Sequence, residues 1–149
     1  KFGAIHGVNL KKVASVKDEI NKIAAEANLL RTKEILEPGV DVDIECVEVP
    51  KTWNYCQEII APGGRIANVG VHGSKVDLQM QALWIKNIRI TTSLVNINTS
   101  PGLLNRIVEG QLDSAKFITH EFKVCEFCKT YEVFDNVSHN CALKTIVYA

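Results

Sequence analysis

Four residues near the C-terminus could together bind a metal ion: Cys125 and Cys128, spaced as Cys-x-x-Cys, and then His139 and Cys141. Zinc sites use cysteine and histidine at such close spacing. However, the cysteine pair lies inside a helical pattern that also contains Phe127, and no second closely spaced pair follows it. We therefore expect a partly buried pair of helical thiols here, with a metal site as the alternative.

Three predicted strands end in residues that could contact a flat ligand. These segments are Val47–Pro50, Val69–Gly73 and Leu94–Asn96. In an open α/β sheet, ligands bind beyond the carboxyl ends of the strands. Gly70 and Gly73 lack a Cβ and would let a ligand approach the backbone, although both could serve only a turn. His72, between them, is equally compatible with a structural and a functional role, whereas His120 and His139 are expected to be structural or exposed.

Three common nucleotide and hydrolase motifs are absent from the sequence. It contains no G-x-G-x-x-G, no Walker A sequence and no G-x-S-x-G. The first two motifs cradle phosphates and the third presents a catalytic serine. Nothing in this chain is therefore expected to bind a pyrophosphate by the usual device.

The elements that must position these residues follow from hydrophobic periodicity, which alternates between the periods of strands and helices. The expected strands are 4–9, 40–47, 65–71, 88–95 and 142–148, with an extended segment at 117–122. The expected helices are 12–37, 50–60, 78–86, 100–108 and 124–134, and a tight turn is expected at 61–64. Strands that alternate with helices imply a parallel sheet and an α/β fold.

Composition excludes several classes of protein. The chain has 149 residues, of which 46% are hydrophobic and 23% charged, as in soluble globular domains. Lysine plus arginine and aspartate plus glutamate both number 17, so no net charge attracts nucleic acid or an anionic membrane. No apolar run approaches the roughly 18 residues of a membrane-spanning helix, and no signal-peptide core is present. We expect a soluble, cytoplasmic protein whose five cysteines are mostly reduced thiols.

Several blocks of sequence, in order and at matching separations, resemble one enzyme family. They are 1–4, 39–45, 62–73, 83–88, Phe134 and 142–144. The chain is similar to the C-terminal part of a zinc-dependent medium-chain alcohol dehydrogenase, closest to the bacterial secondary-alcohol type. The resemblance implies a partial Rossmann-like, doubly wound parallel sheet that lacks its first βαβ unit. Residues 1–149 would then be the C-terminal part of a nicotinamide-dinucleotide-binding domain, with 117–149 partly belonging to the catalytic domain.

The resemblance also implies an activity for the intact enzyme. Its relatives oxidise alcohols to ketones or aldehydes by hydride transfer to NAD or NADP, with a catalytic zinc. In the family, the zinc ligands and the glycine fingerprint precede the part matched here, and Lys1 is not an initiator methionine. We therefore expect a fragment of a longer protein that is inactive alone, with no catalytic residue and no metal ligand of its own.

The nicotinamide side of the cofactor cleft can be carried over to this sequence. The resemblance places Cys46 and Val47 beside the nicotinamide ribose. It places Val69, Gly70 and Val71 at the strand end whose backbone meets the carboxamide.

A second set of residues completes this cleft. The resemblance places Leu94, Val95 and Asn96 at the next strand end beside the same ring, and Lys144 near the pyrophosphate. Glu48 departs from the family pattern, which usually has glycine at that close-approach turn.

Strand 88–95 is the expected site of self-association, because the family pairs this strand with its copy. The strand is rich in β-branched residues, and Arg89 is its only edge-blocking charge. A homodimer or tetramer is therefore expected, and a non-enzymatic dimerising α/β module is the alternative function. The two strands that would lie between 4–9 and 40–47 are missing, so we also expect an open edge on 40–47 and a loosely held segment 1–10.

Overall fold

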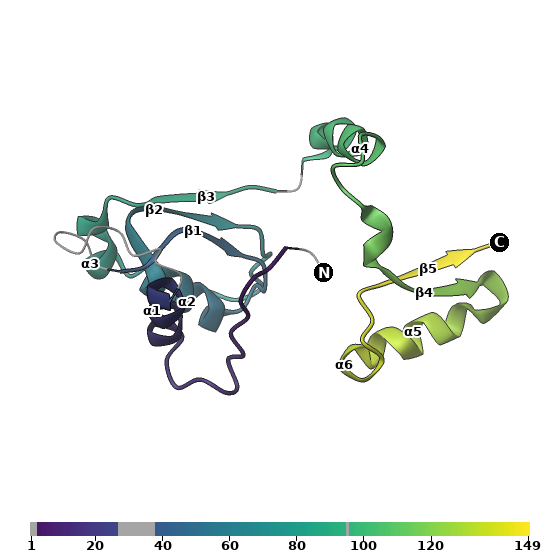
Figure 1. The fold of residues 1–149 in the computed structure, drawn as a ribbon, viewed down its shortest axis with the longest axis horizontal. Helices are drawn as coiled ribbons and strands as arrows, with labels where there is room; N and C mark the ends of the chain where they lie inside the picture. The colour runs from purple at the N-terminus through teal and green to yellow at the C-terminus, as the bar shows by residue number, and fades with distance from the viewer. Residues whose placement is uncertain (1–2, 27–37, 95) are drawn as a thin grey trace. The chain divides into compact units, whose positions relative to one another are not determined.

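The computed structural model describes residues 3–26, 38–94 and 96–149. The chain divides into two compact units, Lys1–Val95 and Asn96–Ala149. Each unit has its own parallel sheet (Figure 1). No helix in the described ranges is both long and apolar enough to cross a membrane.

The first unit is a three-stranded parallel sheet with helices between its strands. Its elements are α1 (Val16–Glu26), β1 (Val40–Glu45), α2 (Pro50–Ile59), β2 (Ile60–Asn68), α3 (Met80–Leu83), a 3-10 turn (Trp84–Lys86) and β3 (Arg89–Thr92). The strand order is β1-β2-β3. Glu45 pairs in register with Asn68, and Asn68 pairs with Thr92. The carboxyl ends of all three strands therefore form one row.

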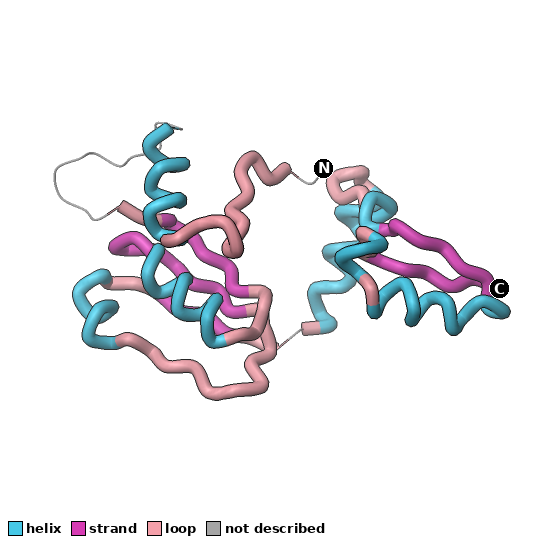
Figure 2. Tube along the Cα trace, turned by 90° about the horizontal axis from the view of Figure 1, so that it is seen from below, coloured by secondary structure: helices cyan, strands magenta, loops and turns pink. Residues whose placement is uncertain are grey.

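Helix α2 carries the apolar face that packs on this sheet. Pro50 occupies its first turn, where the missing N–H costs nothing. Trp53, Cys56 and Gln57 follow at helical spacing and are buried. Helices α1 and α2 lie on the same face of the sheet (Figures 1 and 2). The core cluster consists of Trp53, Cys56, Ile60, Ile66 and Leu83.

Buried polar contacts tie α2 to the segment that leads into α3. The Trp53 indole Nε1 donates to the Asp77 carbonyl at 3.0 Å, and the Gln57 side-chain amide donates to the same carbonyl at 3.1 Å. Gln57 Oε1 accepts from the Gln79 N–H at 2.8 Å. Gln57 is only 3% exposed, so these bonds satisfy its polar atoms inside the unit.

The second unit is a smaller β-α-β arrangement. It contains α4 (Ser100–Val108), β4 (Ile118–Lys123), α5 (Phe127–Asp135), α6 (Val137–Asn140) and β5 (Lys144–Tyr148), with 3-10 turns at 97–99, 114–117 and 124–126. Strands β4 and β5 pair in parallel, and α5 contacts both (Figure 2). The sequence predicted both extended segments but not that they pair.

Parallel strands alternating with helices confirm the predicted α/β class, but several boundaries differ. Residues 12–15 are not helical, and 27–37 lie outside the described residues, so only the part of helix 12–37 that forms α1 is observed. Strand β2 begins at Ile60, and the expected turn 61–64 forms a bulge within it, where the register shifts between Val40 and Val42. Strands 65–71 and 88–95 end earlier than expected, at Asn68 and Thr92.

The strand expected at 4–9 is wrong. No strand forms between residues 3 and 10, and Ile5 is 88% exposed. A strand exists only where a neighbour accepts its hydrogen bonds. Within the described ranges β1 pairs with β2 alone, and segment 3–10 contributes no strand.

Candidate functional site

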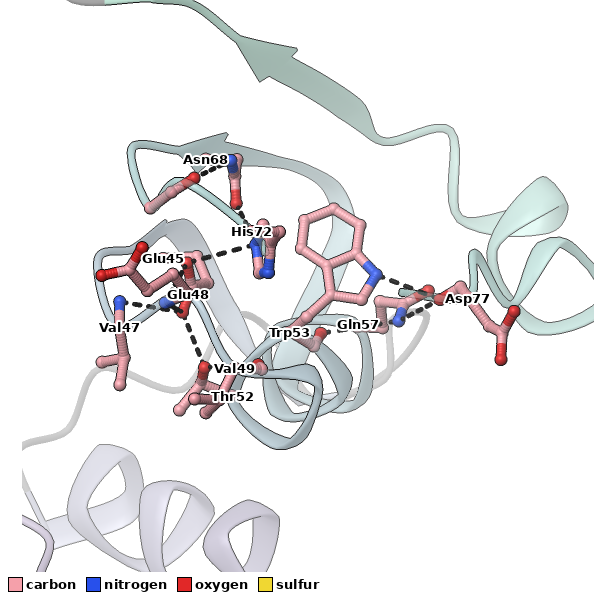
Figure 3. A network of polar contacts seen from close by, with 11 residues as sticks. Glu45, Val47, Glu48, Val49, Thr52, Trp53, Gln57, Asn68, His72 and Asp77 are labelled. Atoms are coloured by element: carbon pink, nitrogen blue, oxygen red, sulfur yellow. Dashed lines mark hydrogen bonds and ion pairs between the residues drawn. The ribbon is translucent and has the colours of Figure 1, made fainter. Parts of the chain in front are cut away.

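Two turns meet at the carboxyl ends of β1 and β2, and Glu45 joins them (Figure 3). The Glu45 carboxylate accepts the backbone N–H of Val47 at 2.9 Å and that of Glu48 at 3.0 Å. It also accepts the Thr52 hydroxyl at 2.6 Å and lies 3.5 Å from His72 Nε2. The side chain therefore closes the turn between β1 and α2.

The main-chain carbonyl of Glu45 holds the second turn. It accepts the N–H of Val69 at 2.8 Å and that of Gly70 at 3.1 Å. A Cβ at Gly70 would lie 2.8 Å from the Glu48 nitrogen and would collide with the Glu45 carboxylate. The missing side chain of Gly70 is therefore required for the contact between the two turns, whereas a Cβ at Gly73 would meet nothing within 4 Å.

The Glu45 side chain is buried and stays ionised. Burial by itself would raise the pKa of this carboxyl, but the Thr52 hydroxyl, the two backbone N–H groups and His72 outweigh it and lower the pKa below the ordinary value. A buried carboxylate is tolerated only when it is hydrogen-bonded in this way.

His72 extends this network towards β2 and α2. Its Nε2 lies 2.8 Å from Asn68 Oδ1, and its ring meets the Trp53 ring edge-on, with centroids 6.1 Å apart. The Asn68 side-chain Nδ2 donates to the Gly70 carbonyl at 2.8 Å. The His72 side chain is 13% exposed, and its Nδ1 is buried without a hydrogen-bond partner. These contacts favour the structural role for His72.

Two clefts flank the joined turns. One has a volume of about 300 Å³ and is lined by Val69, Gly70, Val71 and Leu94, together with β2 and β3 residues. The other, of about 200 Å³, includes Cys46 and Val47 and lies against α2. The apolar side chains at these strand ends are open to solvent, since Val71 is 73% and Leu94 is 85% exposed.

A comparison with known proteins identifies the family of this chain. The profile of the zinc-binding dehydrogenase family matches residues 1–109. The chain belongs to this family.

Individual members of the zinc-binding dehydrogenase family resemble the chain over much of its length. An alcohol dehydrogenase from Cupriavidus necator is 26% identical over 107 residues, which cover 66% of this chain and 28% of that protein. The structure of zinc-dependent alcohol dehydrogenase 2 from Streptococcus pneumonia, in its apo form, is 38% identical, with a TM-score of 0.79 over 97% of this chain and 39% of that one.

A second similar structure contains a cofactor. A short chain alcohol dehydrogenase from Escherichia coli CFT073, complexed with NADH, is 18% identical with a TM-score of 0.78, over 99% of this chain and 39% of that one. At this identity the similarity shows the fold alone. The chain spans less than two fifths of the length of each of these three relatives.

The zinc in the family name does not fit the residues that the structure describes. In ranges 3–26, 38–94 and 96–149, no three His, Cys, Asp or Glu side chains are grouped so that they could hold a metal ion. The alternative metal site of Cys125, Cys128, His139 and Cys141 is therefore wrong. The cysteine pair is also more exposed than expected, since both of its thiols face solvent.

The residues predicted to bind the cofactor are distributed over both units. The structure brings together Val69, Gly70, Val71 and Leu94 in one cleft, with Cys46 and Val47 in the adjacent one. Val95 lies outside the described residues.

Two of the predicted cofactor residues belong to the second unit. The side chain of Asn96 accepts the Asn98 N–H at 2.9 Å and so caps a 3-10 turn. Lys144 is exposed at the start of β5. Their roles stay predictions.

Sequence reasoning missed Glu45 as a site residue. An acidic side chain that ends a strand and is followed seven residues later by Thr52 was the available signal. Glu48, in contrast, was noticed as a departure from glycine, and the structure gives it a φ of 65°, in the left-handed region that favours glycine.

Proposed function

We propose that this chain forms the nicotinamide side of the cofactor site in an NAD(P)-dependent alcohol dehydrogenase that oxidises alcohols to ketones or aldehydes. The observation that carries the proposal is the pair of joined turns at the carboxyl ends of β1 and β2, beside an apolar cleft. This is where nucleotides bind in open α/β sheets. Membership of the zinc-binding dehydrogenase family supports the same assignment.

The chemistry of the turns suits the nicotinamide half of the cofactor better than its phosphates. The N–H groups of Val47, Glu48, Val69 and Gly70 are already bonded to Glu45. Phosphates are bound by free N–H groups, whereas a carboxamide and ribose hydroxyls can donate to carbonyls. We assign the backbone of Cys46, Val47, Val69, Gly70 and Val71 to this contact.

The apolar side chains at the strand ends provide a surface from which the nicotinamide ring can exclude water. Val69, Val71 and Leu94 line the same cleft and are exposed. Burying them against a flat ring removes apolar surface from water and excludes water from the reacting face. When bound, the dinucleotide supplies the hydride acceptor. Roles for Asn96 and Lys144 in binding the dinucleotide are proposed from the family resemblance.

The remaining parts of the parent enzyme are also proposals. We assign the metal ligands to sequence beyond this chain, because the described residues hold no metal-binding group. We assign residues 117–149 partly to the catalytic domain.

Strand β3 is proposed to pair with a second copy. All four of its residues, 89–92, are exposed, and within the described ranges it pairs with β2 alone. An unpaired edge of this kind is a template for another strand. A dimerising module without enzymatic activity would share this feature.

Cofactor titration separates the two functions. The full protein is titrated with NAD⁺, NADH, NADP⁺ and NADPH, followed by nicotinamide fluorescence and calorimetry. Val71→Trp, which fills the cleft, is expected to weaken binding at least about tenfold. Val108→Trp is the matched control, since Val108 is 85% exposed on α4 and lines neither cleft. No binding of any dinucleotide by the wild-type protein would leave the dimerising module as the better function.

A further inference from the structure

We propose that Glu45 is a positioning residue for the cofactor. Its hydrogen bonds set the geometry of the two turns, at Val47–Glu48 and at Val69–Gly70, that face the nicotinamide in the proposed function. This inference rests on the proposed function, because it concerns the site where that function places the ring. Glu45 itself touches no ligand in this proposal. It acts through the backbone that does.

One residue, Glu45, holds both turns. The carboxylate of Glu45 accepts the N–H groups of Val47 and Glu48, and its carbonyl accepts those of Val69 and Gly70. Residues from two different strand ends are thus fixed to a single position of the chain. A shift of the Glu45 side chain would move the Val47 turn against the Gly70 turn.

The two turns are closely packed where they meet. Glu48 and Gly70 approach so closely that a Cβ on Gly70 would lie 2.8 Å from the Glu48 nitrogen. The carboxylate fills the remaining space, and its side chain is 0% exposed. Close-packed groups of this kind transmit a displacement and do not absorb it.

The chemistry of the Glu45 side chain also suits this position. An apolar residue would fill this strand position without the cost of burying a charge, but it would leave the N–H groups of Val47 and Glu48 without an acceptor. The Thr52 hydroxyl would keep only the Val49 carbonyl as its acceptor. A carboxylate has two oxygens and can accept from all of these groups and His72 at once. The site therefore requires an acceptor of this capacity where the two turns join.

The test compares Glu45→Gln with Glu58→Gln in the full protein. Glu58 is an exposed glutamate on α2, so its variant controls for the loss of one charge. We expect the NADH dissociation constant of Glu45→Gln to rise about ten- to hundredfold, the range for losing a hydrogen bond to a charged group. The Michaelis constant for the dinucleotide should rise similarly, with a smaller change in kcat.

Thr52 provides a second pair of variants with a smaller risk to folding. Thr52→Val removes the hydroxyl that Glu45 accepts at 2.6 Å, and Thr52→Ser retains it. We expect weaker NADH binding in the valine variant and wild-type binding in the serine variant. Amide hydrogen exchange without ligand should accelerate at Val47 and Glu48 in Glu45→Gln, while Ile66 in the buried strand stays protected.

The outcomes are distinguishable. A merely structural role for Glu45 would lower the folded fraction and kcat but leave the dissociation constant of the folded protein unchanged, which would overturn the inference. Equal NADH affinity in Thr52→Val and Thr52→Ser, with turn exchange unchanged in Glu45→Gln, would also overturn it. If the wild-type protein binds no dinucleotide, the proposed function fails and this inference fails with it. Binding by the wild type with unaltered affinity in Glu45→Gln refutes the role of Glu45 alone.

Discussion

The contact between the two turns makes a sharp prediction for Gly70→Ala. The φ of Gly70 lies outside the left-handed region, so alanine can adopt this backbone conformation. The added Cβ, however, would lie 2.8 Å from the nitrogen and 3.1 Å from the Cα of Glu48, and it would overlap the Glu45 carboxylate. These neighbours are backbone atoms and a buried charged group, so neither can move aside cheaply.

The cost follows from two contributions. Overpacking a close-packed site costs about 1–3 kcal/mol. Displacing the carboxylate weakens its hydrogen bonds with the N–H groups of Val47 and Glu48, for about 1–3 kcal/mol more. Replacing glycine stabilises the folded state by about 0.4–1 kcal/mol through the unfolded chain. We therefore expect Gly70→Ala to lower the free energy of unfolding by about 1–5.5 kcal/mol.

Gly73→Ala is the matched control, three residues further along the same loop. A Cβ there meets nothing within 4 Å, so only the unfolded-state effect remains, and this variant should be as stable as the wild type or slightly more stable. Urea unfolding followed by tryptophan fluorescence measures both, because Trp53 is buried in the same unit. Gly70→Ala within about 0.5 kcal/mol of Gly73→Ala would refute the close-packing argument.

Three further predictions concern titratable and strained groups. Because the pKa of Glu45 is lowered in the fold, its stabilising contribution is complete above the ordinary value of 4.5 and is lost as the pH falls through the folded pKa. Acid titration should therefore destabilise the wild type more steeply than Glu45→Gln. The comparison removes most of the opposite effect of Asp43, whose pKa is raised mainly by burial and to a smaller extent by the charge of Glu45. Burial and the nearby Asp43 raise the pKa of Cys56 from 9.0 to about 12, so stability should fall as the pH rises through that range, and a thiol reagent should label the four exposed cysteines before Cys56. Glu48→Gly should raise the free energy of unfolding, measured by urea unfolding, by about 0.5 kcal/mol. Glycine removes left-handed strain of about 1–2 kcal/mol, but the larger conformational entropy that glycine loses on folding offsets part of this gain.

The elements that sequence analysis predicted well are those whose signals are local. Helix α2 has a proline in its first turn and apolar residues at helical spacing, and the structure places it at Pro50–Ile59, one residue shorter than predicted. Helix α4 matches its predicted range of 100–108. Strand β1 alternates and is rich in β-branched residues, so its start at Val40 was correct, although it ends at Glu45 and not at Val47. Periodicity and capping contain the information needed for such elements.

The elements that were predicted poorly depend on partners. Segment 4–9 has the composition of a short strand, but no described strand accepts its hydrogen bonds, so none forms there. Residues 61–64 have the composition of a tight turn, yet pairing with Val40 begins at Ile60 and turns them into a bulge. Composition describes what a segment can do locally, whereas pairing is decided by the rest of the sheet.

The candidate site was predicted in part for the same reason. The rule that ligands bind at the carboxyl ends of parallel strands led directly to 69–71, as did the family resemblance. Glu45 was missed because acidic residues alternate with apolar ones along Asp41 to Glu45, a pattern typical of a strand with one solvent face. Only three-dimensional contacts with Val47, Glu48 and Thr52 bury this last carboxylate.

Glu48 stands where the family usually has glycine, and its backbone is strained for that reason. A non-glycine residue in the left-handed region is strained, and such strain persists only when the surroundings hold it in place. Here the Glu45 carboxylate binds the Glu48 N–H, and the Gly70 backbone packs against the same residue. Both restraints act on main-chain atoms, so they would remain in Glu48→Gly while the strain is removed. The side chain of Glu48 therefore adds nothing to these contacts, and the geometry of the turn is specified by Glu45 and Gly70.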